Sequence, residues 1–454
     1  MKYLFVFLLL TFVWSGCTEI EPVEPEPDED IQLGGETSIN NVFIKIFEQP
    51  APNLSATEKD LHFKADAAFG AIYVTAPSTI QSGLGPLFNQ NSCESCHLGN
   101  GRSAFPNSGN DLKGLLFRVS IPGKDGFGGN LPVPHFGLQL QTKASFGKQA
   151  EVQMTIQEVE EIQQFIDGST VNLRKPIYKI ESSYLPIDPS IEISPRIANP
   201  IIGLGLLEAI KESDILKLSD EMDVDQDGIS GKANYVWDIR KKEKAIGRFG
   251  WKASQPNLYQ QTAAAFSGDM GITSPAFPVE NSFGQIQYDS LFDDHEIDET
   301  VLTTTTFYTQ SLGVPSRRNW NMEQVKQGKK LFYEIKCTAC HHPQFFTGAH
   351  EFQFLSNQTI FPYTDMLLHD MGEGLADYRP DFEASGREWR TPPLWGIGLT
   401  QIVGGHTHFL HDGRARNLLE AIMWHGGEAE KSKNQFKALS KSERDAVVEF
   451  LKSL

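Results

Sequence analysis

Two five-residue stretches combine thiols with an imidazole at the spacing used for covalent haem attachment. They are Cys93-Glu-Ser-Cys96-His97 and Cys337-Thr-Ala-Cys340-His341. In a C-x-x-C-H motif the thiols add to the vinyl groups of one haem, and the histidine that follows becomes the proximal ligand of its iron. Two copies therefore predict two covalently bound haem c groups, with His97 and His341 as iron ligands, and they predict redox chemistry.

A C-x-x-C pair also occurs in thioredoxin-like dithiols and in half of a zinc site. Both copies here continue directly into histidine, and both follow a Leu-Phe pair at the same distance, Leu87-Phe88 and Leu331-Phe332. This weak internal repeat is typical of two copies of one haem-binding unit. The sequence has five cysteines, so only Cys17 lies outside the motifs and none is left for a disulfide.

The first residues are typical of an export signal. A positively charged start is followed by an apolar run from Leu4 to Val13, which is too short to span a bilayer. Trp14-Ser15-Gly16-Cys17 then resembles a lipoprotein box, with residues 1–16 as signal peptide and Cys17 as the lipidated residue. An ordinary cleaved signal peptide or a stray cysteine is the alternative. Because haem c is attached outside the cytoplasm, we expect a membrane-anchored lipoprotein of the cell envelope, facing the periplasm or the exterior.

Charge and composition limit the partners and divide the chain. The formal net charge is -18, which argues against nucleic acid and against an anionic membrane surface, so membrane contact is expected through the lipid only. Residues 17–40 are rich in Asp, Glu and Pro, and such a stretch should stay extended as a linker. The remainder predicts an N-terminal haem domain at 41–315 and a C-terminal cytochrome c domain at 316–454.

Helical periodicity is the main secondary-structure signal, and strand signals are few. The segments expected to be helical are Thr155–Asp167, Leu258–Phe266, Glu323–Ile335, Leu418–Trp424 and Ser440–Leu454. In the last segment Ser440 and Glu443 have the spacing of a capping box. The fold class expected from the sequence is mainly α, with two cytochrome c-like haem domains and long loops.

A third motif is independent of the thiols. Asp223, Asp225 and Asp227 alternate and precede a glycine, as in a calcium loop to which the Ile229 carbonyl would add a ligand. Asn234 stands where an EF-hand has a bidentate Glu. We therefore expect a structural Ca²⁺ loop that departs from the EF-hand pattern and is inserted in the N-terminal haem domain. A solvated acidic turn is the alternative.

The second half of the chain resembles known dihaem enzymes. Arg390-Thr-Pro-Pro-Leu-Trp395 and Phe409-Leu-His-Asp-Gly-Arg414 are similar to runs in bacterial dihaem cytochrome c peroxidases and in the methylamine-utilisation dihaem enzyme. With Gly203–Ile210, Gly247–Ala253 and His411–Glu428, the resemblance is closer still to the dihaem oxidoreductase family, also labelled "thiol oxidoreductase". It covers about residues 41–454 and implies a peroxidase-like enzyme.

For the second haem, the resemblance implies a distal ligand near the end of the helix that follows His411. The related peroxidases have Met there, and counting along the chain places His425 in that position. We therefore expect His425 to be the sixth iron ligand, with Met423 as its rival and His406 and His408 as further alternatives. Histidine in place of Met should lower the potential of this haem and make it a closed, electron-storing centre.

For the first haem, a peroxidase needs an open iron position, an acid–base carboxylate and a hydrogen-bond donor. The resemblance and an apolar setting favour Glu208 as the carboxylate, against the alternative of a solvent-facing helix residue, and Gln139 is the expected donor. His135 would close this iron if it became a ligand. Trp251 is either an electron relay between the haems, as in the related enzymes, or a packed core residue.

Together these expectations describe an exported dihaem oxidoreductase. An external donor such as a small cytochrome or a cupredoxin would reduce the second haem. Electrons would pass to the first haem and reduce hydrogen peroxide or a similar oxidant there. Two alternatives remain open: a dihaem electron carrier with both irons capped, and an oxidase that acts on another substrate.

Overall fold

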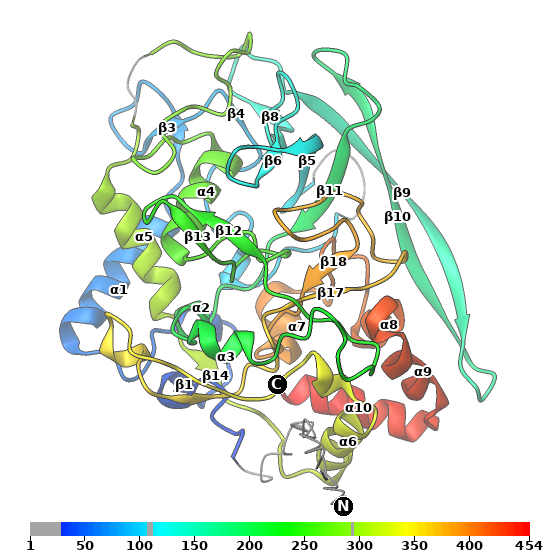
Figure 1. Ribbon diagram of the computed structural model, residues 1–454. Helices are drawn as coiled ribbons and strands as arrows, with labels where there is room; N and C mark the ends of the chain where they lie inside the picture. Colours follow the sequence, from blue (N-terminus) through cyan, green and yellow to red (C-terminus); the bar gives the residue numbers. More distant parts are fainter. Residues whose placement is uncertain (1–28, 107–111, 292–294) are drawn as a thin grey trace, which may run out of the picture.

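The computed structural model describes residues 29–106, 112–291 and 295–454 (Figure 1). The leader segment and Cys17 lie outside these ranges. The helices within them are α1 (Ala56–Phe69), α2 (Leu204–Glu208), α3 (Glu212–Leu216), α4 (Leu258–Met270), α5 (Glu299–Ser311), α6 (Glu323–Glu334), α7 (Thr400–Gly404), α8 (Leu418–Trp424), α9 (Glu430–Ala438) and α10 (Lys441–Ser453). None of these described helices is long and apolar enough to cross a membrane.

The structure also contains many short strands. They are β1 (Ser38–Ile39), β2 (Val74–Thr75), β3 (Ser82–Leu84), β4 (Leu87–Phe88), β5 (Leu115–Lys124), β6 (Asn130–Leu131), β7 (Gln139–Leu140), β8 (Lys143–Ala144), β9 (Val152–Gln164), β10 (Thr170–Ser183), β11 (Glu192–Ile197), β12 (Tyr235–Asp238), β13 (Glu243–Ile246), β14 (Val314–Pro315), β15 (Phe345–Phe346), β16 (Thr359–Ile360), β17 (Leu368–Asp370) and β18 (Glu388–Arg390). Helix accounts for 28% and strand for 22% of the residues. The fold is therefore mixed α/β, and the expectation of a mainly α fold is wrong.

The largest single error concerns Thr155–Asp167, which the sequence predicts to be helical. This segment lies mostly in β9, which pairs antiparallel with β10 along its length. Its Glu and Gln residues favour a helix, but Thr155, Ile156, Val159 and Ile162 are β-branched and favour a strand. The two strands are joined through Asp167-Gly168, where Gly168 has a φ of 84°. Asp-Gly between two such runs is a hairpin signal. The hairpin extends as a long arm past α8 (Figure 1).

The other expected helices are confirmed. They correspond to α4, α6, α8 and α10, of which α4 continues to Met270. At α10 the Ser440 side chain accepts from the Glu443 amide, and the Glu443 carboxylate accepts from the Ser440 amide at 2.8 Å. The capping box is therefore present as the spacing predicts.

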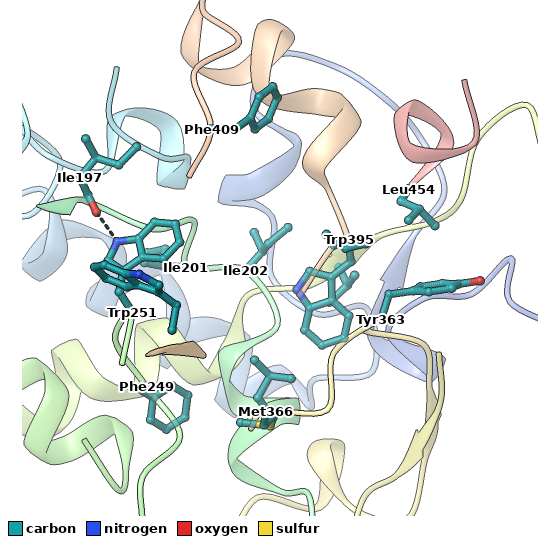
Figure 2. Packing of buried hydrophobic residues seen from close by; sticks show 14 of the residues in the cluster. Ile197, Ile201, Ile202, Phe249, Trp251, Tyr363, Met366, Trp395, Phe409 and Leu454 are labelled. Atoms are coloured by element: carbon teal, nitrogen blue, oxygen red, sulfur yellow. Dashed lines mark hydrogen bonds between the residues drawn. The ribbon is translucent and has the colours of Figure 1, made fainter. Parts of the chain in front are cut away.

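One hydrophobic core extends through both halves of the chain. Its buried side chains include Phe117 and Trp251 from the N-terminal part, and Trp395 and Phe450 from the C-terminal part. Figure 2 shows some of these side chains around the two tryptophans. The two expected haem domains thus share one core, and the boundary between residues 315 and 316 remains a prediction from the sequence.

The stretch from residue 29 to 40, expected to be an extended linker, is folded. Its Asp30 carboxylate is fully buried and accepts hydrogen bonds from Arg317 at 2.5 Å and from the Tyr363 hydroxyl at 2.5 Å, with Lys329 Nζ at 3.2 Å. β1 then pairs in parallel with β14. Cations that lie far along the chain neutralise the charge that would otherwise keep this stretch in water.

Candidate functional site

The first thiol–histidine motif borders a mainly apolar cavity. Cys93, Cys96 and His97 follow β4 and all line it. His97 Nδ1 bonds the Asn199 carbonyl at 2.7 Å, so Nε2 is the nitrogen left for a metal. Burial lowers the pKa of His97 to about 4, and the imidazole is therefore neutral near pH 7, as a metal ligand must be.

The second motif repeats this arrangement in a second cavity. Cys337, Cys340 and His341 follow α6 and line it. His341 Nδ1 bonds the Tyr363 carbonyl at 3.0 Å. Burial, together with the nearby His425, lowers the pKa of His341 to about 4. In both cavities the cysteines form no disulfide, so each cavity offers two sulfurs and one neutral imidazole nitrogen, a donor set that fits one haem c.

His425 lies in the second cavity with His341. It directly follows α8 and its Nδ1 bonds the Ala421 carbonyl at 2.8 Å. Its rival Met423 is buried but does not line this cavity. His406 and His408 line neither cavity, since His406 Nε2 bonds the Arg102 carbonyl and His408 Nδ1 accepts from the Phe105 amide. Of the predicted distal ligands, the structure brings only His425 to the second motif.

A common wall separates the two cavities. The residues that line both are Arg102, Trp251, Arg390, Pro392 and Ile397. Trp251 is 6% exposed, and its Nε1 donates to the Ile197 carbonyl at 2.8 Å (Figure 2). It is therefore a packed core residue that also lies between the two centres, so the two interpretations made from the sequence are compatible.

Gln139 belongs to a polar group in the first cavity. Its Nε2 donates to Asp269 Oδ1 at 2.8 Å, and its Oε1 accepts from Arg118 Nη1 at 3.2 Å. All three side chains line the cavity, and Asp269 is the only carboxylate among the described residues that do so. Burial raises the pKa of Asp269. Sequence reasoning missed Asp269, although a single carboxylate at the end of the apolar helix α4 is a usable signal.

Glu208 and His135 lie outside the first cavity. Glu208, the last residue of α2, accepts at Oε1 from the Leu258 amide, where α4 begins, and at Oε2 from Gln310 Nε2, both at 2.7 Å, and His350 Nε2 lies 3.5 Å away. Glu208 thus caps α4 behind the cavity wall. His135 is exposed on the surface, and its carbonyl accepts from the Tyr184 hydroxyl.

The acidic motif forms a loop whose grouping differs from the sequence pattern. Asp223 and Asp225 come together with Asp220, with carboxylate oxygens within 4.8 Å of one another. Asp227 instead accepts from the Ile229 amide at 2.7 Å. Asp220 lies outside the D-x-D-x-D-G spacing, so this pattern in the sequence does not identify it as a possible ligand.

This acidic loop is connected to the second cavity. Ser230, which ends the loop, donates to Glu428 through its amide and its hydroxyl, both at 3.0 Å. His369 lies between Glu428 and Asp365, at 2.7 Å from each, and both His369 and Glu428 line the second cavity. A cation in the loop would therefore act on the surroundings of the second motif through Glu428.

Two cavities with the same donor set, packed against one wall, are what a protein with a pair of haem groups needs. The chain belongs to the family described as "Di-haem oxidoreductase, putative peroxidase", whose model matches residues 30–454. Membership implies haem cofactors and an oxidoreductase activity. A search of the curated proteins found no match to this chain.

Proposed function

We propose that the protein is an exported peroxidase-like enzyme that stores electrons at the second haem and reduces hydrogen peroxide or a similar oxidant at the first. The asymmetry of the cavities carries this proposal. The second contains His425 as well as His341, whereas His97 is the only histidine among the described residues that line the first. One iron would then be capped by two imidazoles, and the other would keep a position for the oxidant.

Reduction of hydrogen peroxide consumes two electrons and two protons and yields two waters, so one electron from each haem suffices. The haems supply the electrons when bound. Gln139 remains a prediction for the hydrogen-bond donor, because its Nε2 already donates to the Gly268 carbonyl at 2.7 Å and to Asp269 Oδ1 at 2.8 Å. A carboxylate must deliver a proton to the leaving oxygen. Glu208 remains a prediction for this role, but Asp269 lines the cavity and Glu208 does not. Trp251 lies where an electron passing between the haems would be conducted.

The first test is electron paramagnetic resonance of the purified protein, oxidised, half-reduced, and half-reduced with peroxide. We expect one low-spin ferric haem and one high-spin ferric signal that peroxide perturbs. Two low-spin signals in every state would contradict an open first iron.

An electron carrier with both irons capped is the second candidate, and Met270 favours it. This side chain also lines the first cavity and is 3% exposed, and Met is a common axial ligand of haem. In that case Met270→Leu would convert a low-spin first haem to high spin. In the peroxidase this substitution would leave the first haem high-spin, as it already is.

The remaining parts of the proposal concern partners and location. We propose a small cytochrome or a cupredoxin as electron donor, a lipid anchor at Cys17, and a place in the cell envelope facing the periplasm or the exterior. The C-x-x-C-H motifs support export, because haem is joined to such thiols outside the cytoplasm. Globomycin, which blocks lipoprotein signal cleavage, should leave the residue 1–16 leader attached if the anchor exists.

We also propose that the acidic loop binds Ca²⁺. The oxygens of Asp220, Asp223 and Asp225 converge as hard-cation ligands do. Chelator should lower the melting temperature of the wild type, and added Ca²⁺ should restore it. Asp223→Asn should abolish this response, whereas Asp289→Asn, in another loop, should not. If chelator leaves the melting temperature of the wild type unchanged, the loop does not bind Ca²⁺ and is a solvated acidic turn.

A further inference from the structure

Several buried arginines next to the first cavity have a guanidinium nitrogen without a hydrogen-bond partner. Arg102 is 6% exposed and lines both cavities. Its Nε has no hydrogen-bond partner, and no carboxylate among the described residues pairs with it. Its guanidinium carbon lies 5.4 Å from the centre of the Phe409 ring. Burial alone lowers the pKa of Arg102 to about 10, so the group remains a cation near pH 7.

Such a cation is costly to bury unless an anion accompanies it. A guanidinium presents its donors in a plane and preferably binds a carboxylate or a phosphate through two of them. The cavity wall at Arg102 is therefore suited to bind an anion that is not part of the polypeptide. Each haem has two carboxylates of its own, on its propionate side chains.

Two further arginines of the first cavity also have an unpartnered guanidinium nitrogen, although Arg196 is ion-paired with Asp381. Arg118 Nε and Arg196 Nη2 are buried without hydrogen-bond partners, and both residues line the cavity. Behind them, Asp381 is paired with Arg196 at 3.1 Å and with Arg379 at 3.4 Å, and Asp377 is paired with Lys252 at 2.8 Å. Asp269 also lies near Arg118, so the four cations Arg118, Arg196, Arg379 and Lys252 face three carboxylates. The group therefore keeps a surplus of positive charge that a haem propionate would neutralise.

We propose that Arg102, Arg118 and Arg196 bind haem propionates, with Arg102 placed in the common wall where its charge acts on both haems. This inference rests on the haem binding in the proposed function but not on peroxidase activity. Arg118 and Arg196 line the first cavity alone, so their charges should act mainly on the first haem.

The test is a spectroelectrochemical titration of the holoprotein at equal haem content, with pyridine haemochrome absorbance as the check on content. Removing a buried cation favours the ferric form, so Arg102→Gln should lower the midpoint potentials of both haems. Arg118→Gln should lower that of the first haem only. The charge-retaining Arg102→Lys should stay closer to the wild type, and Arg387→Gln, at a partly exposed surface pair, should have no effect.

Unchanged potentials in Arg102→Gln would overturn the proposal. If that variant also lost a spectral response of the wild type to added acetate, the guanidinium would instead serve a carboxylate-bearing substrate. If Arg102→Gln does not fold, Arg102→Lys is tested instead. Its single ammonium replaces the two-donor guanidinium, so the propionate-bending band in the resonance Raman spectrum should shift from its wild-type position. If the midpoint potentials shift in Arg102→Gln but the wild type does not turn over peroxide, the proposed peroxidase activity is refuted and the proposed propionate site is supported.

Discussion

His97 and His341 are held in the same way although they lie far apart in the sequence. Each Nδ1 bonds a backbone carbonyl, at 2.7 Å and 3.0 Å. Such a bond fixes the tautomer and aims Nε2 at the metal position. Because the proximal histidines are held alike, the proposed difference between the two centres rests on the other residues of each cavity, and His425 lines only the second.

Replacing His425 by Met should raise the midpoint potential of the second haem, because thioether ligation raises the potential of haem iron. The redox titration of each haem measures this. Met423→Leu is the matched control, since Met423 lies two residues earlier and does not line the cavity. A low-spin second haem with an unchanged potential in His425→Met would show that another residue is the ligand.

The position of Glu208 predicts a pH-dependent contribution to stability. Burial would raise its pKa, but the bonds from His350, the Leu258 amide and Gln310 outweigh burial and lower the pKa below its ordinary value of 4.5. Stability from this carboxylate is therefore present above pH 4.5 and is lost as the pH falls through the lower, folded-state pKa. Glu208→Gln should cost about 1 kcal/mol at pH 7.

Chemical denaturation of the wild type and of Glu208→Gln between pH 7 and pH 3 tests this. The difference in the free energy of unfolding should shrink toward the acid end, and Glu181→Gln, on the exposed part of β10, should show no such trend. Unchanged stability combined with lost peroxide turnover would instead restore Glu208 to the acid–base role that the sequence predicts.

Sequence reasoning identified the residues whose chemistry is local. The C-x-x-C-H motifs place thiols and imidazole within five positions, so their proximity does not depend on the fold. Arg102 and Asp269 could not be found in this way. Arg102 reaches the wall only because Trp251 and Arg390 come from distant segments, and Asp269 is defined by its bond to Gln139, 130 positions away.

At the scale of elements, the β9–β10 hairpin holds the loop that follows Phe409. Arg174 on β10 donates to the carbonyls of Gly413 at 2.8 Å and Arg414 at 3.1 Å, and Leu410 and His411 of that loop line the second cavity. Arg174→Ala should therefore cost about 2 kcal/mol of stability through the lost bonds and should change the absorption spectrum of the second haem.

Thermal unfolding and absorption spectra measure the two effects, with Lys175→Ala at the exposed neighbouring position as control. Lower stability with an unaltered second haem would mean that the hairpin supports the fold but not the centre.

Helices and strands differed in how well the sequence predicted them. Helices α6 and α10 each have an apolar face, and α10 also has a capping box, so their signals lie within one segment. Most of the strands form two-stranded sheets, and β1 is only two residues long and pairs with β14. Such a strand exists because of its partner, and no periodicity of its own could have revealed it.

At the scale of the molecule, the net charge of -18 predicts how electrons arrive. A negative field steers a cationic donor and speeds its encounter, and salt screens this attraction. The rate of reduction by a basic cytochrome should fall by about tenfold or more as ionic strength rises from about 0.01 to 0.2 M, whereas reduction by a neutral small-molecule reductant should change little. A salt-independent rate with the basic cytochrome would place donor docking on an uncharged patch.

The buried Asp30 restricts the order in which the chain can assemble. Its partner Tyr363 lies 333 positions later, and the carbonyl of Tyr363 orients His341. During synthesis the first described segment must wait, unpaired, until nearly the whole polypeptide has emerged. Closure of so long a loop is slow, so the thiols of the second motif should remain accessible to a modifying enzyme until late. If haem is joined to these thiols as proposed, the late arrival of the C-terminal partners would leave time for the attachment before the thiols are buried.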